Sequence, residues 1–575
     1  MEIGSGRTKE HKKGETMTRR NLHSSHAFLI LVIAVLLLAG CAQAPAKPTE
    51  PPQPVQAPTQ VPTQPPALPT PTPVPSGPVM GGTVTLAFQE DPNSLDAALG
   101  YNLPAWQSLM NLYRGLMIYE GDHAAPDMAD GMPEISPDGT VYTFKLKHGI
   151  KFTNGREVEA ADFKYSLERV LDPALASWAN YYLASIKGAQ DVIDGKAKEC
   201  SGIEVLDKYT LRFTLNAPDM TFLNVLALPN NWVVPKEEVE KWGKDFEKHP
   251  VGCGPFILKE LTLGEKAVFV RNPDFFHEGQ PYIDETIMYF GVDPATALMR
   301  MEKGELDVLF GDMIPPSDFP RLLGDAKYKD WLYREPSMYT WWLGLNNKMA
   351  PFDKLAVRQA LNLAINREKS AKLTGGKGEP LWAIYPSTSP GFQPDYKPYP
   401  FDPEAAKAKL KEAGLPDGFE FELLIRENPL EPVVAQAIQQ DLAEIGVKAN
   451  IKQVSGTTAL DLITGGKAQA YLNDWYMIQP DPADLINNLY MTGAGSNQDF
   501  YSNPKVDELA RQALAEQNRE KRIKLYQDIE RLLMDDAVHV PLFNNISYYM
   551  HNPRIQGFYS RSEYGPFFER MWIKP

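Results

Sequence analysis

Residues 132–171 read MPEISPDGTVYTFKLKHGIKFTNGREVEAADFKYSLERVL. From Tyr142 to Leu146 apolar and polar residues alternate, which is the period of a strand with one buried face. The segments 137–139 (Pro-Asp-Gly) and 153–155 (Thr-Asn-Gly) have the residues that turns require. Residues 162–171 then follow a helical pattern, which an Asp-Pro pair ends. We predict a strand and a helix joined by tight turns.

Further motifs follow along the chain at intervals. They are Gly252-Cys253-Gly254-Pro255-Phe256, Arg271-Asn272-Pro273, Val357-Arg358-Gln359-Ala360-Leu361, Ala364-Ile365-Asn366-Arg367-Glu368, Tyr501-Ser502-Asn503-Pro504 and Val540-Pro541-Leu542. Together with residues 138–166, this set closely resembles the signature of the family 5 extracellular solute-binding proteins, the oligopeptide- and dipeptide-binding type that feeds ABC importers. The resemblance covers essentially all of residues 80–575.

The resemblance implies an α/β fold of the periplasmic-binding-protein type, in which two α/β lobes are hinged and the larger lobe contains an extra domain. Its boundaries give lobe I as residues 80–115, 236–337 and 546–575. The extra domain is then residues 116–235, and lobe II is residues 338–545. A ligand that contacts both lobes would shift an equilibrium between open and closed forms. We expect a monomer.

Local patterns in the second half agree with an α/β lobe. Residues 431–445 have apolar residues on one helical face, stop at Gly446 and lead into a strand at 447–454. This order predicts an α/β unit. Asp353 is placed to cap one helix that runs to about Lys372.

An apolar run of twelve residues, Ala27 to Leu38, follows the basic pair Arg19-Arg20. A transmembrane helix needs about 20 residues, whereas this length suits a signal peptide. The run ends in Leu38-Ala39-Gly40-Cys41, which resembles the lipobox of bacterial lipoproteins. This resemblance implies removal of residues 1–40 and a lipid on the Cys41 sulfur. A short anchor that is never cleaved is the alternative.

Residues 45–78 contain fourteen prolines in thirty-four positions. Such a segment cannot build a core and favours an extended polyproline II conformation. We interpret residues 41–79 as a spacer that holds the folded part outside the cytoplasm, in the periplasm or at the outer face of the cytoplasmic membrane, by its lipid anchor alone. A proline-rich ligand for a partner domain is the alternative. We suspect that Met17 is the true start.

The charge and the cysteines restrict the function further. A net charge of −15 and a pI near 5.2 argue against nucleic acid and against docking on anionic lipid. Besides Cys41 the chain has Cys200 and Cys253. A disulfide between them is permitted in an oxidising compartment, but their spacing does not show whether their Cα atoms come within reach. Two separate buried thiols are the alternative.

No enzyme motif is found in the sequence. HExxH, GxSxG, Walker A and paired CxxC motifs are missing, and the histidines lack the spacing of metal ligands. Residues 374–379 are rich in glycine but lack the GKS/T ending, so we interpret them as a helix stop. We expect no catalytic residue, no cofactor and no metal site, and a protein that acts by binding.

The resemblance also indicates where a ligand would bind. In peptide-binding relatives, a W-x-x-D-Y-x-x-P segment provides an Asp that pairs with the α-ammonium group of the peptide. Here Trp475 falls in that register and Ile478 occupies the Asp position. An apolar residue cannot offset the desolvation of a buried ammonium, so Asp474 or Asp481 would have to replace that Asp. The ligand-binding residues we expect are Tyr101, Leu103, Tyr181, Tyr182, Trp475, Ile478, Asp481 and Asn544.

Two other hypotheses stay open beside a peptide delivered to an ABC permease and ATPase complex. The ten Trp and 25 Tyr residues, with Asn544-Asn545, also suit an oligosaccharide or another neutral solute. A surface-displayed scaffold that binds a protein and serves no transporter is the other hypothesis. Genes for two permeases and two ATPases next to this one would argue against the scaffold.

Overall fold

The computed structural model describes residues 77–120, 123–561 and 564–575, all of which lie in one unit, Pro73–Pro575. The predicted signal peptide, Cys41 and most of the predicted spacer lie outside the described residues. Within the described part, no helix combines the length and apolar character needed to span a membrane.

A mixed sheet of eleven strands organises the described residues. The strand order is β15-β14-β16-β12-β17-β11-β1-β10-β9-β8, and β13 pairs with β17. The strands are β1 (Thr83–Ala87), β8 (Phe256–Thr262), β9 (Lys266–Arg271), β10 (Glu285–Tyr289), β11 (Val308–Phe310), β12 (Leu332–Leu345), β13 (Gly378–Pro380), β14 (Glu420–Arg426), β15 (Lys448–Val454), β16 (Ala470–Tyr476) and β17 (Val540–His551).

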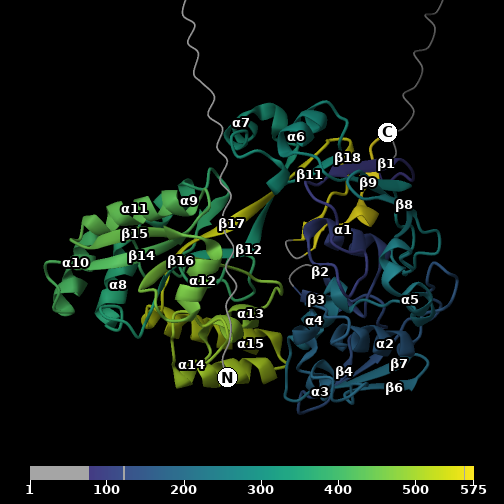
Figure 1. Cartoon of the computed structure of the whole chain (residues 1–575), viewed down its shortest axis with the longest axis horizontal. Helices are drawn as coiled ribbons and strands as arrows, with labels where there is room; N and C mark the ends of the chain where they lie inside the picture. The colour runs from purple at the N-terminus through teal and green to yellow at the C-terminus, as the bar shows by residue number, and fades with distance from the viewer. Residues whose placement is uncertain (1–76, 121–122, 562–563) are drawn as a thin grey trace, which may run out of the picture. The chain divides into compact units, whose positions relative to one another are not determined.

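The two longest strands of this sheet, β12 and β17, run antiparallel through its middle (Figure 1). Their register shifts between Pro336 and Thr340, opposite Ile546 and Asn544. Beyond them, β17 pairs with β11 on one side and β12 pairs with β16 on the other. The predicted lobe boundaries, at residues 337–338 and 545–546, fall at this interruption and stay a prediction.

Fifteen α-helices surround the strands in the described residues. They are α1 (Leu103–Leu112), α2 (Ala160–Leu171), α3 (Ala189–Ile193), α4 (Phe222–Ala227), α5 (Lys236–Trp242), α6 (Pro294–Glu302), α7 (Phe319–Gly324), α8 (Leu355–Ala364), α9 (Arg367–Lys372), α10 (Pro403–Glu412), α11 (Glu431–Ala443), α12 (Gly456–Thr464), α13 (Ala483–Leu485), α14 (Pro504–Ala515) and α15 (Arg519–Asp535).

The α/β unit predicted in the second half is confirmed. β14 and β15 pair in parallel, and α11 connects them. Val434, Ile438 and Leu442 of α11 are buried in the core that the apolar residues of β14 and β15 share. The helical period therefore located the face that the sheet covers.

The prediction of one helix from Asp353 to about Lys372 is wrong. The structure has two helices there, α8 and α9, with a break at Ile365 and Asn366. The Asn366 side chain accepts a hydrogen bond from the Lys369 backbone N–H at 3.0 Å and so caps α9. An asparagine that bonds to the backbone two or three residues ahead competes with a continuous helix.

The strand and helix predicted within residues 132–171 are confirmed as β5 (Val141–Lys145) and α2. Tyr142 and Phe144 are fully buried, and both turn glycines have positive φ, +72° at Gly139 and +89° at Gly155. β5 belongs to a four-stranded sheet with β4 (Glu134–Ile135), β7 (Thr210–Thr214) and β6 (Ile203–Asp207). The remaining short strands pair in twos: β2 (Met117–Glu120) with β3 (His123–Pro126), β18 (Ile555–Gln556) with β21 (Trp572–Ile573), and β19 (Ser560–Arg561) with β20 (Gly565–Pro566).

Cys200 and Cys253 do not form a disulfide. They are two separate buried thiols, as the alternative interpretation of the sequence stated. Each thiol has its own surroundings. The Cys253 sulfur lies 3.7 Å from the Met128 sulfur, and the Cys200 thiol donates to the Lys187 carbonyl oxygen at 3.4 Å. Burial raises the pKa of both thiols, so neither is a reactive thiolate at neutral pH.

A pair of glycine substitutions tests the close approach of β14 and β15. An added Cβ at Gly418 would overlap the backbone of Gly446, whereas one at Gly414 would meet nothing within 4 Å, and both residues have positive φ. Gly414→Ala should cost only the positive φ, about 1 kcal/mol. Gly418→Ala should cost roughly 1–3 kcal/mol more, because the two backbones must separate. Thermal unfolding measures the difference, and equal melting temperatures for the two variants would contradict this packing.

Candidate functional site

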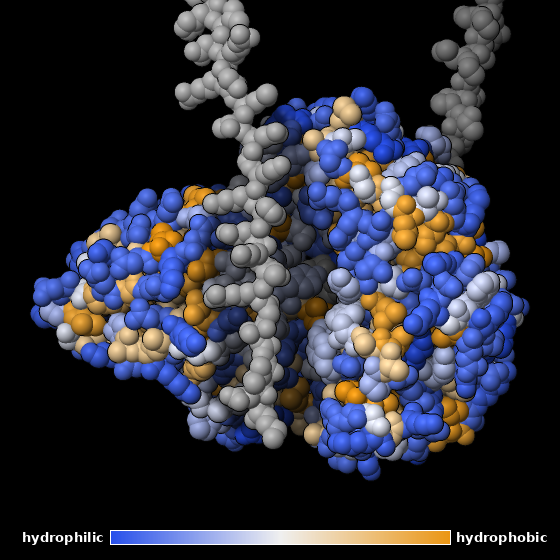
Figure 2. Space-filling model, in the orientation of Figure 1, coloured by the Kyte–Doolittle hydropathy of each residue, from blue (hydrophilic) through white to orange (hydrophobic). Residues whose placement is uncertain are grey.

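A pocket of about 750 Å³ lies between residues 181–225 and residues 474–496. This volume is in the range of known ligand pockets. Its lining includes four aromatic rings, three carboxylates and three amides, and no Lys, Arg or His among the described residues: Tyr181, Tyr182, Trp475 and Tyr476; Asp219, Asp474 and Asp484; Gln479, Asn487 and Asn488. On the face drawn in Figure 2, hydrophobic residues form only small groups, as is usual for the surface of a globular domain.

Asp484 organises the loop between β16 and α13. One carboxylate oxygen accepts from the Trp475 indole N–H at 3.0 Å, and the other accepts from the backbone N–H groups of Ile478 at 3.0 Å and Gln479 at 3.2 Å. Asn488 adds a longer contact at 3.3 Å. Burial raises the pKa of Asp484 to about 6, although these hydrogen bonds favour its charged form. Among the described residues, no ion pair with a basic side chain involves it.

Asp474 differs from Asp484 because a cation neutralises it. The Arg426 guanidinium contacts Asp474 and also binds Glu431, which is fully buried, at 2.5 Å. The Tyr339 hydroxyl donates to Asp474 as well, and Arg426 lies over the Trp341 ring, 5.6 Å from its centroid. Two carboxylates therefore share one guanidinium and two aromatic neighbours, which leaves little free charge at Asp474.

The opposite wall carries the third carboxylate and two stacked tyrosines. Asp219 accepts from the Thr221 backbone N–H at 3.0 Å and from its hydroxyl at 2.6 Å, and burial raises the pKa of Asp219. The rings of Tyr181 and Tyr182 lie 3.9 Å apart between centroids. Burial raises the pKa of both tyrosines, and the negative charge of Asp484 raises it further. Asp484 and these two rings line the same pocket.

The structure brings four of the predicted site residues together. Tyr181, Tyr182, Trp475 and Ile478 all line this pocket. The other four lie elsewhere. Asp481 lines the neighbouring pocket and pairs with Arg522 at 3.1 Å, Tyr101 is 65% exposed, Leu103 is the first residue of α1, and Asn544 is buried in β17.

Asn544 has a backbone role in this structure. Its side-chain amide donates to the Ser337 carbonyl oxygen at 3.2 Å and to that of Asn545 at 3.1 Å. It therefore satisfies backbone groups where the register of β12 and β17 shifts. A role for Asn544 in ligand binding stays a prediction.

Sequence reasoning did not identify Asp484, Asp219, Asn487 or Asn488. In an acidic chain, carboxylates are common and carry no pattern that separates a buried one from a solvated one. The position of Asp484, two residues after the Pro-Asp-Pro turn at residues 480–482, was the only local signal. Within the described residues, no cluster of His, Cys, Asp and Glu side chains is suited to hold a metal ion.

A mixed α/β sheet with a ligand-sized pocket is consistent with a solute-binding protein. A sequence model of the bacterial extracellular solute-binding proteins, family 5 (Middle), matches residues 123–497. The chain belongs to this family, whose members bind solutes for transporters and are not enzymes.

Relatives across most of the chain have named ligands. The Di/tripeptide-binding protein 2 of Pseudomonas aeruginosa is 28% identical over 506 residues, which is 83% of this chain and 92% of the relative. The Glutathione-binding protein GsiB of Salmonella typhimurium is 28% identical over 477 residues, 81% of this chain and 89% of the relative.

Solved structures agree with the fold. The murein tripeptide-binding protein MppA in its unliganded open form matches with a TM-score of 0.79 and 26% identity, over 87% of this chain and 99% of that one. DppA from Helicobacter pylori in complex with the peptide STSA matches with a TM-score of 0.65 and 26% identity, over 86% and 99% of the two chains.

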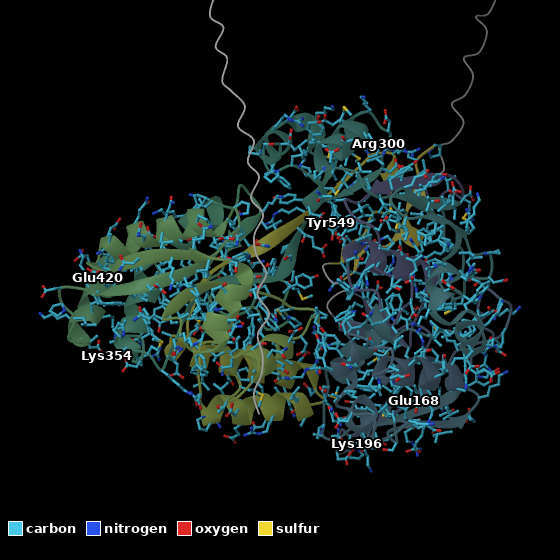
Figure 3. The ribbon with its side chains drawn as sticks, viewed as in Figure 1. Glu168, Lys196, Arg300, Lys354, Glu420 and Tyr549 are labelled. Atoms are coloured by element: carbon cyan, nitrogen blue, oxygen red, sulfur yellow. The ribbon has the colours of Figure 1, made fainter. Side chains whose placement is uncertain are left out.

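Removing the guanidinium beside Asp474 should destabilise the protein strongly. In Arg426→Gln, the buried Glu431 and the partly buried Asp474 lose their cation, which should cost about 2 kcal/mol or more. Lys448→Gln is the control, because Lys448 binds Glu420 at 3.0 Å on the exposed edge of the same sheet, where Figure 3 labels Glu420. An exposed pair of this kind contributes about 0–1 kcal/mol. Thermal unfolding compares the two, and equal losses would show that Asp474 is not held in this way.

Proposed function

We propose that this chain binds a short peptide in the pocket between residues 181–225 and residues 474–496 and delivers it to an ABC importer, without catalysing a reaction. The family and the named ligands of the two relatives support a peptide. The volume of the pocket and its mixture of rings, amides and carboxylates suit a short polar chain.

The observation that carries the proposal is the charge of Asp484. Arg426 neutralises Asp474, whereas the described structure gives Asp484 only hydrogen-bond donors that are neutral. An enclosed ammonium group needs an opposite charge, since its desolvation costs several kcal/mol. Asp484 therefore takes the role that the sequence resemblance assigned to an Asp at position 478, where this chain has Ile478.

The ammonium group can approach Asp484 without breaking the loop. The contact with Asn488 is the longest of the four hydrogen bonds to this carboxylate, and the same Asn488 amide also donates to the Asp484 carbonyl oxygen at 2.7 Å. A ligand can therefore replace it at small cost. The faces of Tyr181 and Tyr182 offer a cation–π contact on the other side.

Delivery follows from contact with both walls. A ligand held by Tyr181 and Tyr182 on one wall and by Asp484 on the other favours the form in which the walls are close. We infer that the two halves of the sheet move relative to one another at the shift of register in β12 and β17. The boundaries of lobe I, the extra domain and lobe II given above remain part of this proposal.

A second candidate ligand is an oligosaccharide or another neutral solute. The four aromatic rings and three amides of the lining favour it, because sugar rings stack on aromatic faces and hydrogen-bond to amides. A neutral ligand would give the negative charge of Asp484 no partner. We therefore rank it second.

Calorimetry with tri-alanine that has a free or an acetylated amino terminus tests the peptide proposal. The free peptide should bind at least about tenfold more tightly, a difference of about 1.4 kcal/mol. Asp484→Asn should remove this difference. Asp474→Asn is the control, since Arg426 already neutralises that carboxylate, and it should retain the difference.

The pH dependence of this binding has a defined sign. The pKa of Asp484 is about 6 in the folded protein, above the ordinary value of an Asp. Without ligand, its contribution to stability is therefore present below about pH 4 and is lost as the pH rises through 6. The affinity for the free peptide should instead rise about tenfold from pH 5 to pH 7, because the carboxylate becomes charged. A flat profile in the wild type, or the same slope in Asp484→Asn, would contradict the role of Asp484.

We also propose that the protein is a lipoprotein, held to the cell membrane through Cys41 and carried as a monomer at the end of the proline-rich spacer. The support is the twelve-residue apolar run and the Leu-Ala-Gly-Cys sequence at residues 38–41. Neither lies among the described residues.

The anchor is tested by Cys41→Ser in a strain that expresses the full chain. Without the thiol no lipid can be attached, so the protein should stay unprocessed or be released into the soluble fraction. Palmitate labelling and membrane fractionation measure this. Unchanged labelling and fractionation would exclude the anchor at Cys41.

A further inference from the structure

A second, smaller pocket of about 180 Å³ lies on the other side of the turn at residues 480–484. The two pockets share two dividing elements. Helix α4 and the two residues before it present Thr221 and Val225 to the first pocket, and Met220, Leu223 and Asn224 to the second. The turn presents Asp484 to the first pocket and Asp481 to the second. Whatever holds α4 against the turn therefore shapes the proposed ligand pocket.

Two hydrogen bonds join the α14–α15 pair to the opposite wall, one at the segment before α4 and one at the turn between β4 and β5. The Met220 backbone N–H donates to the Leu514 carbonyl oxygen at 2.9 Å. The Gln517 side-chain amide donates to the Ser136 carbonyl oxygen at 3.1 Å. These bonds connect segments that are far apart in the sequence, and they lie beside the second pocket, which Met220 and Gln517 line.

A group of three charges lies at the same contact. Arg522 of α15 binds Asp481 at 3.1 Å, with side chains only 15% and 4% exposed. The second oxygen of Asp481 accepts from the Ala483 backbone N–H at 3.0 Å, so this carboxylate also fixes the turn that leads to Asp484. On the α4 side, the charge of Arg522 lowers the pKa of Asp219 and the charge of Asp481 raises it, so both act across the contact.

Other side chains surround Arg522, Asp481 and Asp219 at this contact. Tyr142 donates to the Asp219 carbonyl oxygen at 2.9 Å, and Tyr526 lies beside Asp481. Burial raises the pKa of Tyr526, the negative charges of Asp481 and Asp219 raise it further, and the charge of Arg522 opposes this. Without the guanidinium, the charges of the buried Asp481 and the half-buried Asp219 would be left unbalanced at this contact, and like charges repel each other. Arg519 and His123 also line the second pocket and are the other basic residues to consider.

We propose that Arg522 is a positioning residue for the ligand pocket: it joins the two walls by binding Asp481 in the turn before Asp484 and by balancing the charge of Asp219 in the segment before α4. Arg522 does not line the proposed ligand pocket, so it acts through these two carboxylates. The effect of Arg522 on ligand affinity rests on the proposed function. Its effect on the contact between the two walls is independent of that function.

Hydrogen exchange of the ligand-free protein tests the contact itself. In Arg522→Gln, exchange in residues 219–225 and 480–485 should become at least tenfold faster, because the Met220 N–H bond to Leu514 opens more often. Exchange in β14 and β15 should not change. Arg519→Gln, on the same helix and lining the same pocket, is the matched control and should leave residues 219–225 as in the wild type.

Two further variants test whether the charge of Arg522 is what slows hydrogen exchange. Arg522→Lys should restore most of the protection, since it keeps the charge. Asp219→Asn combined with Arg522→Gln should also restore part of it, since one of the two repelling carboxylates is then neutral. If Arg522 acted only by packing, the backbone amides of the double variant would exchange as fast as those of Arg522→Gln. That result would overturn the proposal.

Affinity for free tri-alanine is the second measurement. Arg522→Gln should bind it at least tenfold more weakly than the wild type, with recovery in Arg522→Lys. Unchanged exchange in residues 219–225 of Arg522→Gln overturns the positioning role, whatever the affinity. Faster exchange together with a wild type that does not bind tri-alanine supports the positioning role and counts against the peptide ligand, so the two proposals fail separately.

Discussion

The antiparallel pairing of β12 with β17 is the constraint on which the rest of the fold depends. These strands connect the group β15-β14-β16 to the group β11-β1-β10-β9-β8 in one sheet. Their register shifts at Pro336 to Thr340, and the Asn544 amide satisfies the Ser337 carbonyl group there. A buried carbonyl without a partner would cost about 1–3 kcal/mol, so this side chain makes the interruption tolerable.

The same pairing places one wall of the candidate site. β16 pairs with β12 so that Trp475 lies opposite Thr340, and Asp474 lies opposite Trp341. The next residues leave the sheet, and Asp484 folds the following turn back onto Trp475. The wall that carries Trp475, Ile478 and Asp484 is thus fixed to the strand that also contains the shift of register. If the sheet bends at the shift of register, Trp475, Ile478 and Asp484 would move together.

Charge distribution separates the roles of the carboxylates around the pocket. Arg426 holds Asp474 and Arg522 holds Asp481, and both pairs support the structure. Asp484 has only neutral donors among the described residues, and its raised pKa reflects a charge that burial disfavours. Such a group is costly in the empty protein, and a cationic ligand removes that cost. The buried charge of Asp484 therefore lowers the stability of the empty protein and favours binding of a cationic ligand.

Local patterns predicted much of the fold, and non-local contacts explain what they missed. The apolar period of residues 431–445 and the alternation at residues 142–146 were sufficient for α11 and β5, because burial of one face determines both patterns. The break at Asn366 was missed, since it depends on a cap and not on the apolar period. Of the eight ligand-binding residues that the resemblance indicated, Tyr181, Tyr182, Trp475 and Ile478 line one pocket in the structure.

Burial and pairing explain the remaining differences at the site. Asp484 was missed because only its burial distinguishes it from the many acidic residues of the chain. Asn544 and Asp481 were predicted from chemical type, but their partners in this structure are the Ser337 carbonyl group and Arg522. Those partners come from distant parts of the chain, so no local pattern could have indicated them.

The central claim is that this pocket encloses a solute with a cationic end. Mass spectrometry of the small molecules released when the purified full chain is denatured tests it most directly, because it does not depend on a chosen probe. The account predicts short peptides with free amino termini. An oligosaccharide or an anionic solute as the main released molecule would contradict it.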